Sequence, residues 1–512
     1  MKLIKNILVP VAANIDLQRE IAKKLTISTT SITNLQILRR SLDARHRNRL
    51  KYNFTAIANL PRLTHPDVLD YKLPTAYLQE VNFCADKHPY IIGAGPAGLF
   101  AALALTEKGY QPYIFERGQT IAERSKKVDL FWQTGQLDPE SNVQFGEGGA
   151  GTFSDGKLTS RNRDFYTNQV FALFIKFGAS ADIKIDAKPH LGTDKLKFII
   201  TNIRKYLEQQ GCRFFWNHKL DKIIVKNGKL ISITINGEPH QPACAILALG
   251  NAARDTFSLL KNQLIMLPKP FAVGVRIEHT QEYINATFYE NKTNFTLTGP
   301  ATYRLTAKHQ NRGIYSFCMC PGGQIIAAAS QPNTAVTNGM SYSSRDGKMA
   351  NSALVVNVAP PDFGSSALDG VQFQKHLEKT AFNPDLPYFA PAQLASDFLN
   401  NKTSKTLNSS YRPGTYSRNL QELFPEYINQ ALKTALNKFA KCYPGFVQKG
   451  KLLAPETRTS CPLRILRQKD NFACQGIKNL FAIGEGSGYA GGIISSAADG
   501  YKLGSTFSTK NN

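Results

Sequence analysis

The 512-residue sequence contains no long hydrophobic run. No stretch approaches the roughly 18 consecutive apolar residues that a membrane-spanning helix requires, so we expect no membrane insertion. The first residues, MKLIKNILVPVAANID, look only faintly like a signal peptide, because their apolar run is short and contains a proline; a first β-strand is the better interpretation. A chain of this length, with a hydrophobic fraction of 42%, is expected to fold into two or three globular domains.

Cysteine is also sparse, with eight residues spread along the chain and no CxxC pair. This pattern excludes a dense disulfide framework and predicts free thiols in a reducing compartment, hence a cytoplasmic protein. The close pair Cys318 and Cys320 has no second pair or ligand histidines near it in sequence, so we expect no metal site. Alternate residues of a strand lie about 6.5–7 Å apart, which is awkward for a disulfide. We therefore interpret the pair as buried thiols lining a cavity, with a catalytic role as the alternative.

Acidic residues are outnumbered, with 38 Asp and Glu against 62 Lys and Arg, for a net charge of +24. The densest basic run, residues 39–51, has six basic residues and one acid. Such a run can contact phosphates, although a solvated face is the simpler interpretation. A basic lining would also suit an anionic ligand. We expect a small-molecule substrate, anionic in one interpretation, with a nucleic-acid partner as the less favoured alternative.

The pattern G-x-G-x-x-G occurs three times, and its context decides what each match means. In the first, Gly93 permits a tight turn, Gly95 lets a pyrophosphate approach, and Gly98 lets the following helix lie close to the sheet. A strand precedes this match, a helix follows, and a second strand ends at Glu116, whose carboxylate can accept ribose hydroxyls. The helix N-terminus favours phosphates. This segment predicts a dinucleotide site.

The other two matches lack this context. Residues 486–491 lie between a strand and a helix, but no closing acid follows, so we expect a second wall of the same site. There Glu485 could bind a ribityl hydroxyl, and the amides of Gly491-Gly492-Ile493 could reach the pyrophosphate or ring. Residues 146–151 are followed by turn-forming residues and no helix, so this match is not a fingerprint. We expect the loop 145–158 to lie against the same cofactor, with Ser154-Asp155-Gly156-Lys157 facing it.

With these residues in view, the chain resembles the FAD-dependent dehydrogenases (NAD(FAD)-utilizing dehydrogenases) of bacteria and plastids. These belong to the glutathione reductase-like flavoproteins with two dinucleotide-binding folds. The resemblance covers residues from about 88 to the end and rests on IIGAGPAGLFAALAL, FERG, FGEGGAGTFSDGKL, KPHLGTDKL, KPFAVGVRIEH, YSFCMCPGG, NGMSYSSRDGKMANSALVVNV, APETRTSCPLRI and NLFAIGEGSGYAGGIISSAADG. Two departures are Asn251, where histidine is expected, and Cys461, where serine is expected. The first puts a proton-relay role at that position in doubt.

The resemblance implies an α/β fold with a discontinuous Rossmann-type FAD-binding domain at 87–270 and 450–512. An inserted β-rich α+β substrate domain is expected at 271–449, and a small N-terminal α/β module at 1–86, with residues 60–74 as a linker. The implied function is an FAD-dependent oxidoreductase of unknown substrate. Alternatives are a flavin-dependent RNA-modifying enzyme and a non-catalytic flavin-binding protein. Because no second complete βαβ fingerprint is present, NAD(P)H would dock only transiently.

The candidate catalytic residues are Lys157, Arg276 and Glu278. Lys157 could stabilise anionic reduced flavin or contact phosphate, or it could form a solvent-facing turn pair with Asp155. Arg276 and Glu278 would share one face of a strand and could line the substrate cavity, with a structural ion pair as the alternative. His279 could act as a general acid or base, but a lone histidine is more often structural. The predicted cofactor-binding residues are Gly93, Gly95, Pro96, Ala97, Gly98, Glu116, Arg117, Gly149, Ser154, Asp155, Lys157, Gly250, Gly484, Glu485, Gly491, Gly492 and Ile493.

Overall fold

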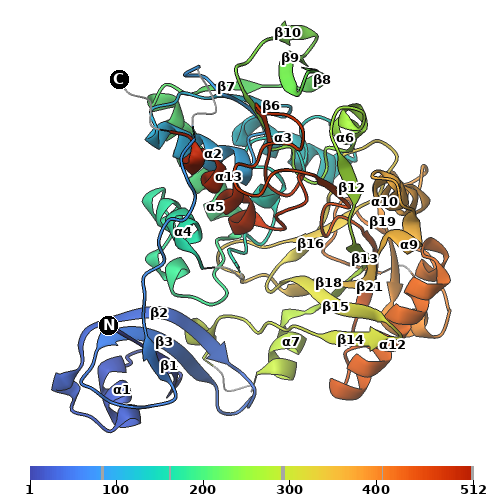
Figure 1. Cartoon of the computed structure of the whole chain (residues 1–512). Helices are drawn as coiled ribbons and strands as arrows, with labels where there is room; N and C mark the ends of the chain where they lie inside the picture. Colours follow the sequence, from blue (N-terminus) through green and yellow to red (C-terminus); the bar gives the residue numbers. More distant parts are fainter. Residues whose placement is uncertain (82–85, 161–162, 290–293, 406, 509–512) are drawn as a thin grey trace.

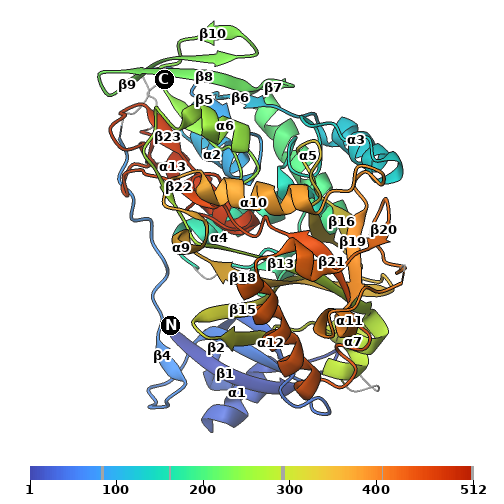
Figure 2. The ribbon, with the colours of Figure 1, turned by 90° about the vertical axis from the view of Figure 1, so that its right-hand side faces the viewer.

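The computed structural model of the chain describes residues 1–81, 86–160, 163–289, 294–405 and 407–508, and Cys84 lies outside these ranges. The chain forms a small N-terminal module, a Rossmann-type domain built from two distant parts of the sequence, and a β-rich domain between those parts (Figure 1). The rotated view separates the N-terminal module at one end from the Rossmann-type domain at the other (Figure 2). The mixed α/β class agrees with the prediction.

The N-terminal module is a four-stranded sheet in the order β2-β3-β1-β4 with one α-helix packed against it. Its elements are β1 (Lys2–Pro10), α1 (Leu17–Leu25), the 3-10 helix η1 (Thr29–Ser31), β2 (Thr33–Asp43), β3 (Lys51–Asn59) and β4 (Val68–Asp70). The first strand is thus confirmed. The predicted linker at 60–74 is wrong in part, because β4 lies within it and pairs with β1 through Leu69 opposite Leu3.

The Rossmann-type domain holds a five-stranded parallel sheet in the order β23-β11-β5-β6-β7. Its elements are β5 (Tyr90–Ile92), α2 (Pro96–Glu107), β6 (Tyr113–Glu116), α3 (Ile121–Thr134), η2 (Ala150–Phe153), α4 (Phe165–Lys176), η3 (Ala181–Lys184), α5 (Gly192–Gln209), β7 (Arg213–Trp216), β11 (Ala245–Leu247), α6 (Arg254–Leu260), β23 (Leu480–Ala482) and α13 (Ile493–Thr506). A three-stranded antiparallel sheet joins it, formed by β8 (Leu220–Lys226), β9 (Lys229–Ile235) and β10 (Glu238–His240). Asn227 and Gly228 turn the predicted hairpin with φ of +49° and +69°.

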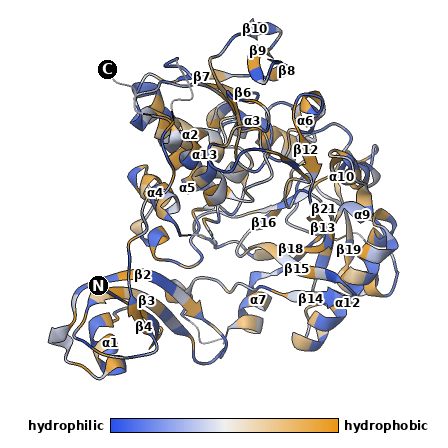
Figure 3. Ribbon diagram, in the orientation of Figure 1, coloured by the Kyte–Doolittle hydropathy of each residue, from blue (hydrophilic) through white to orange (hydrophobic). Residues whose placement is uncertain are grey.

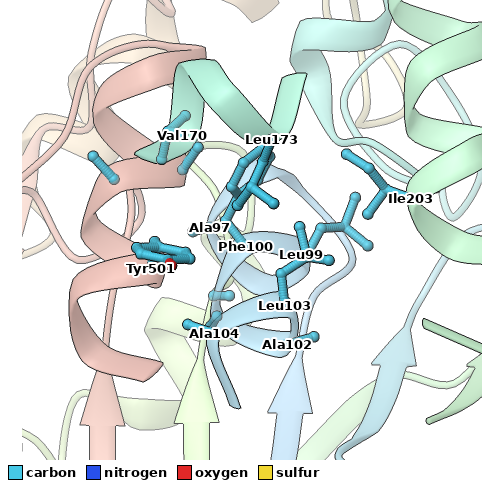
Figure 4. Close-up of a cluster of buried hydrophobic side chains, with 14 of the residues drawn as sticks. Ala97, Leu99, Phe100, Ala102, Leu103, Ala104, Val170, Leu173, Ile203 and Tyr501 are labelled. Atoms are coloured by element: carbon cyan, nitrogen blue, oxygen red, sulfur yellow. The ribbon is translucent and has the colours of Figure 1, made fainter. Parts of the chain in front are cut away.

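Helix α2 is the centre of this domain's hydrophobic core. Its sequence has no polar face before Thr106, and its residues Ala97 to Leu105 are all buried. Side chains of α4, α5 and α13 surround it, among them Val170, Ile203 and Tyr501 (Figure 4). Helix α13 approaches α2 so closely that a Cβ on Gly500 would lie 1.9 Å from the backbone oxygen of Ala97. This glycine contact fixes the C-terminal helix beside the first one.

The β-rich domain is built on a seven-stranded sheet in the order β14-β15-β18-β13-β21-β19-β20. Its elements, with the flanking pair β12–β22, are β12 (Met266–Pro268), β13 (Phe271–Thr280), α7 (Gln281–Phe288), α8 (Phe295–Thr298), β14 (Thr306–His309), β15 (Arg312–Cys320), β16 (Gln324–Ala327), β17 (Thr337–Met340), β18 (Met349–Val358), α9 (Pro360–Phe363), α10 (Asp369–Thr380), β19 (Ala390–Leu394), α11 (Ala395–Leu399), β20 (Thr415–Ser417), η4 (Leu420–Leu423), α12 (Glu426–Cys442), β21 (Lys451–Glu456) and β22 (Leu463–Ile465). The predicted boundary at 450 needs correction, because β21 hydrogen-bonds to β13 and β19 inside this sheet.

Hydrophobic and hydrophilic residues are interspersed along the ribbon and do not gather in one long apolar helix (Figure 3). Across the part of the chain that the structure describes, no helix combines the length and the hydropathy needed to cross a bilayer.

Candidate functional site

One large cavity, of about 2700 Å³, lies where the three parts of the chain meet. Its walls include the turn after β5, the loop at 144–157, the turn before α13, strand β2 of the N-terminal module and the cavity end of β15. Pockets for single small ligands usually measure about 300–1,000 Å³. This cavity is therefore large enough for a dinucleotide together with a second molecule.

The turn after β5 brings the N-terminus of α2 into the cavity wall. Gly93 has a φ of +114°, and a Cβ on it would lie 2.4 Å from the backbone oxygen of Ala248, so this position requires glycine. Gly95 is the N-cap residue and Pro96 the first helical residue, and no side chain caps the helix. Gly93, Gly95, Pro96 and Ala97 line the cavity. Gly98 does not, and it packs against the oxygen of Gly93 instead.

Glu116 is fixed in the cavity wall by backbone amides. Its Oε2 accepts a hydrogen bond from the Ala94 amide at 2.9 Å, and its Oε1 accepts from the amides of Gly118 at 2.9 Å and Gly146 at 3.0 Å. An ionised carboxylate has about four acceptor sites, so one remains for a ligand hydroxyl. The same carboxylate thereby connects the turn after β5 with the loop that carries the glycine motif at 146–151.

Arg117 also lines the cavity, but its guanidinium is held by protein groups. Its Nη1 and Nη2 donate to the carboxylate of Asp255, both at 2.9 Å, and its Nε donates to Glu140 at 2.7 Å. The guanidinium also lies over the ring of Phe145, 4.0 Å from its centroid. Arg117 therefore acts first as a clamp around the loop at 144–146.

The loop at 145–158 lies against the turn after β5 and borders the cavity, and its contact with a cofactor stays a prediction. The Gly148 amide donates to the oxygen of Ala94 at 2.9 Å, and Gly149 packs against Gly95. Among the described residues that follow, only the single 3-10 turn η2 occurs before α4 begins at Phe165. The glycine match at 146–151 is thus confirmed not to be a Rossmann turn. The loop carries Gly149, Ser154, Asp155 and Lys157 into the cavity wall.

Asp155 is fully buried and organises three neighbouring side chains. Lys157 Nζ donates to its Oδ2 at 2.7 Å, Arg345 Nε donates to its Oδ1 at 3.0 Å, and the hydroxyl of Ser341 also donates to it. Burial by itself would raise the pKa of Asp155, but the charges of Lys157 and Arg345 outweigh it and lower the pKa to about 2. Lys157 Nζ also donates to the oxygen of Met319, so a fixed ammonium group stands at the cavity. No local pattern in the sequence singled out Arg345.

The turn before α13 forms the opposite wall. Glu485, Gly491, Gly492 and Ile493 line the cavity, and so does Gly250 after β11, while Gly484 lies behind them and donates its amide to Asp499 at 2.7 Å. No side chain caps α13. Burial raises the pKa of Glu485 to about 7, although Asn251 donates to its Oε1 at 3.3 Å. Asn251, the first departure from the family pattern, thus contacts a carboxyl group that titrates near neutral pH.

The structure places Arg276 and Glu278 away from the cavity, which corrects the prediction that they line it. Arg276 is fully buried, and its Nε and Nη2 donate to Glu456 at 2.9 and 2.8 Å. Glu278 is also fully buried and accepts from the amide and hydroxyl of Ser410. Strand β13 is paired at both edges and buried along its length except at Thr280, so its charged side chains pack against protein groups. The alternative interpretation, a structural ion pair, describes Arg276.

His279 and the two arginines of the segment APETRTSCPLRI, Arg458 and Arg464, have structural partners. His279 is buried with its Nε2 2.7 Å from the oxygen of Phe446, and burial lowers its pKa to about 4. Arg458 lines the cavity, but its guanidinium donates to Glu378 and Ser330. Arg464 is exposed and lies over the ring of Tyr489. None of the three presents an unengaged charged group to the cavity.

The basic run at 39–51 serves in part to attach the N-terminal module. Arg40 pairs with Asp186 at 2.8 Å, and its amide and oxygen bond to the backbone of Ile185 and Ala187. Arg45 is held by Asp43. Sequence reasoning missed two exposed cations of the cavity wall, Lys188 and Arg304. For these two described residues the structure gives no ion pair with a carboxylate. No group of three histidine, cysteine or carboxylate side chains suited to a metal occurs among the residues described.

Comparison with solved structures finds matches at low similarity. CtdE in complex with FAD is 11% identical, with a TM-score of 0.30 and coverage of 82% of each chain. The flavin-dependent brominase Bmp2 is 11% identical, with a TM-score of 0.37 and coverage of 82% of this chain and 77% of that one. An oxidoreductase from Methanosarcina mazei is 11% identical, with a TM-score of 0.32 and coverage of 81% and 98%. These similarities are too low to support any inference about activity.

Comparison with sequences is more decisive. Residues 270–459 match the family described as "FAD-dependent protein, C-terminal domain-like", and residues 1–58 match "Domain of unknown function (DUF8436)". A protein of Clostridium beijerinckii, named "Uncharacterized protein", is 43% identical over 506 residues, which cover 95% of this chain and 94% of that one. The chain therefore belongs to the family of this Clostridium beijerinckii protein, and most of its β-rich domain matches the FAD-dependent C-terminal domain model.

Proposed function

We propose that the protein is an FAD-dependent oxidoreductase, of the dehydrogenase or reductase type, that acts on a small anionic molecule. One observation carries the proposal: the N-termini of α2 and α13, neither capped by a side chain, open into the same cavity. The positive end of a helix dipole and its N–H groups favour phosphate. Two such ends beside one carboxylate suit a dinucleotide with a pyrophosphate and a ribose.

The residues present fit FAD. Gly95, Pro96 and Ala97 would hold the pyrophosphate from one side and Gly491-Gly492-Ile493 from the other, while Glu116 would accept a hydrogen bond from the ribose. When bound, FAD supplies the transfer of a hydride or of electrons. Lys157, held by Asp155, places a fixed positive charge where negative charge can develop. Glu485 can hold or release a proton at its carboxyl oxygen near pH 7.

The anionic substrate is inferred from the uncompensated cations of the cavity. Lys188 and Arg304 both line the cavity wall with exposed side chains. Partial desolvation in the wall, followed by the charge of Arg304, lowers the pKa of Lys188. His190 beside them has its pKa lowered to about 4 by burial and by Arg345, so it is neutral at pH 7. Two cations for which the described residues supply no carboxylate partner attract a carboxylate or phosphate group.

The cofactor proposal is tested by the colour of purified protein. Gly95 has an ordinary φ of −79°, and the nearest atom to a Cβ there is 3.8 Å away, so Gly95→Asp is expected to fold. Aspartate is even a favoured N-cap residue, but its carboxylate would take the place of the pyrophosphate and repel it. We expect yellow wild-type protein, a colourless Gly95→Asp variant with an unchanged circular dichroism spectrum, and an intermediate Gly95→Ala variant. A folded wild type that fails to take up added FAD would refute the proposal.

The substrate proposal is tested with citrate and inorganic phosphate as probes. In FAD-loaded protein, binding of either anion is followed by the change in flavin absorbance or fluorescence. Hydrogen bonds to charged groups contribute about 1.5–3 kcal/mol, so the double variant Lys188→Ala/Arg304→Ala should weaken binding at least roughly tenfold. Lys229→Ala, an exposed lysine on the distant hairpin, is the matched control. Equal anion affinity in both variants would contradict an anionic substrate. Bleaching of the flavin by NADH or NADPH would identify the reductant.

A further inference from the structure

Cys318 occupies a β-bulge in the cavity wall. Strand β15 pairs Phe317 with Ala353 and Cys320 with Asn351 of β18, so β15 has one extra residue between these two pairs. Cys318 has a φ of +46°, a left-handed conformation that is uncommon outside glycine. Bulges are frequent next to functional sites, where they redirect a side chain. Cys318 is partly exposed and lines the cavity, whereas Cys320 behind it is fully buried.

The bulge turns the Cys320 thiol back toward Cys318. Cys320 Sγ donates to the backbone oxygen of Cys318 at 3.2 Å. In a regular strand, alternate residues lie about 6.5–7 Å apart, at the upper limit for a disulfide. Because the bulge interrupts the regular strand between these two residues, the regular-strand distance does not argue against a redox pair here.

The charges around the pair favour ionisation of Cys318 and disfavour ionisation of Cys320. Lys157 Nζ contacts the oxygen of Met319, and Arg276 Nη1 contacts the oxygen of Cys318 at 3.4 Å. The hydrogen bond from Cys320, followed by the charges of Lys157 and Arg276, lowers the pKa of Cys318 against the effects of burial and of Asp155. The pKa of Cys320 is raised by its hydrogen bond with Cys318 and by burial. One thiol is thus exposed and ionisable, and its partner is buried and protonated, an arrangement suited to thiol–disulfide exchange.

We propose that Cys318 and Cys320 form a redox-active dithiol pair that exchanges electrons with the flavin, with Cys318 as the attacking thiol and Cys320 as the resolving thiol. The exchange with flavin rests on the proposed function; the interconversion of the pair between dithiol and disulfide does not. On oxidation, the two thiols lose two protons and two electrons and form one S–S bond. Oxidised flavin takes up the same two electrons and two protons, and the reverse reaction breaks the S–S bond.

The pair is tested first by mapping its thiols in the FAD-loaded protein. The protein is equilibrated with mixtures of reduced and oxidised dithiothreitol, quenched with acid, alkylated and analysed by peptide mass spectrometry. We expect Cys318 and Cys320 to lose alkylation together as the mixture becomes more oxidising, with a peptide lighter by two hydrogen atoms. Cys318→Ser and Cys320→Ser should each abolish that species. Cys461→Ser, at a buried thiol near the same cavity, and Cys442→Ser, at an exposed thiol on α12, should leave it unchanged.

Reactivity supplies a second test. In the Cys320→Ser variant, alkylation of Cys318 should reach half its maximal rate at a lower pH than alkylation of Cys442 in the same protein, because the thiolate is the reacting form. In wild-type protein, a pair that stays reduced in oxidised dithiothreitol and in diamide would overturn the proposal. So would a Cys318 thiol that titrates no lower than Cys442.

Contact with the flavin is read from absorbance. We expect Cys320→Ser to remain yellow and to gain a long-wavelength charge-transfer band from the Cys318 thiolate, which the double variant Cys318→Ser/Cys320→Ser lacks. The exchange with flavin would be overturned by the following combination of results. The wild-type protein binds FAD and forms a reversible disulfide, but reducing its flavin does not reduce the disulfide, and Cys320→Ser shows no charge-transfer band. Colourless protein with a reversible disulfide would instead refute FAD binding while leaving the dithiol pair established.

Discussion

Substitution of Arg276 by methionine distinguishes a structural role from a substrate-binding role. The guanidinium is fully buried and donates to Glu456 at 2.9 and 2.8 Å and to Asn351 Oδ1 at 2.7 Å. Methionine keeps most of the apolar stem but leaves the buried Glu456 without its cation. Removing one partner of a buried ion pair costs about 3–5 kcal/mol. In a domain of this size 1 kcal/mol shifts the melting temperature by about 2–4 °C, so the β-rich domain should melt roughly 10 °C lower.

The assay is scanning calorimetry of the FAD-loaded protein, with flavin release followed in parallel. Arg312→Met is the matched control, because Arg312 pairs with Asp362 at the surface with 29% of its side chain exposed. A surface pair contributes only about 0.2–1 kcal/mol, so this variant should melt close to the wild type. Replacing both partners, in Arg276→Met/Glu456→Leu, should recover part of the loss by removing the unpaired charge. An Arg276→Met protein with an unchanged melting temperature but no turnover would refute the structural role.

Three further predictions concern other parts of the molecule. Asp155 has its pKa lowered to about 2, so the unfolded chain takes up the proton first as pH falls. Its contribution to stability, about 2–3 kcal/mol, is present above about pH 5 and is lost towards pH 2. The difference in the free energy of unfolding between wild type and Asp155→Asn, measured in urea, should therefore shrink over that pH range. Glu485 has its pKa raised to about 7, so the folded state holds its proton more tightly, and the free energy of unfolding should decline as pH rises from about 5 to 7. If urea unfolding shows the same decline with pH in Glu485→Gln as in the wild type, this prediction is contradicted. Gly500→Leu should separate α13 from α2, because a Cβ there would lie 1.9 Å from the oxygen of Ala97, and we expect a loss of at least about 1–3 kcal/mol in thermal unfolding together with weaker FAD retention.

Much of the site could be read from local sequence, because a turn's conformation depends on a few consecutive residues. Gly93 must adopt a positive φ between a strand and a helix, and the alternation of strand, glycine turn and helix identified both cofactor walls. The side chains that act across the cavity could not be read in the same way. Arg276 and Glu278 have an unusual pattern in their strand, but whether that face meets a cavity or a packed loop depends on residues more than a hundred positions away.

The sequence by itself determined that this protein has a strand–glycine–helix turn at 90–107, a second such turn before the C-terminal helix, and a glycine-rich loop at 145–158 that no helix follows directly, since glycine spacing and strand–helix order encode these features locally. Only the tertiary structure decided which charged residues face the cavity. It paired Arg276 with Glu456, joined Asp155 to Arg345, left Lys188 and Arg304 exposed, and bent β15 so that the Cys320 thiol donates to the oxygen of Cys318. The physical reason is that a charge is either neutralised or left available according to its neighbours in space, and strands distant in sequence supply those neighbours.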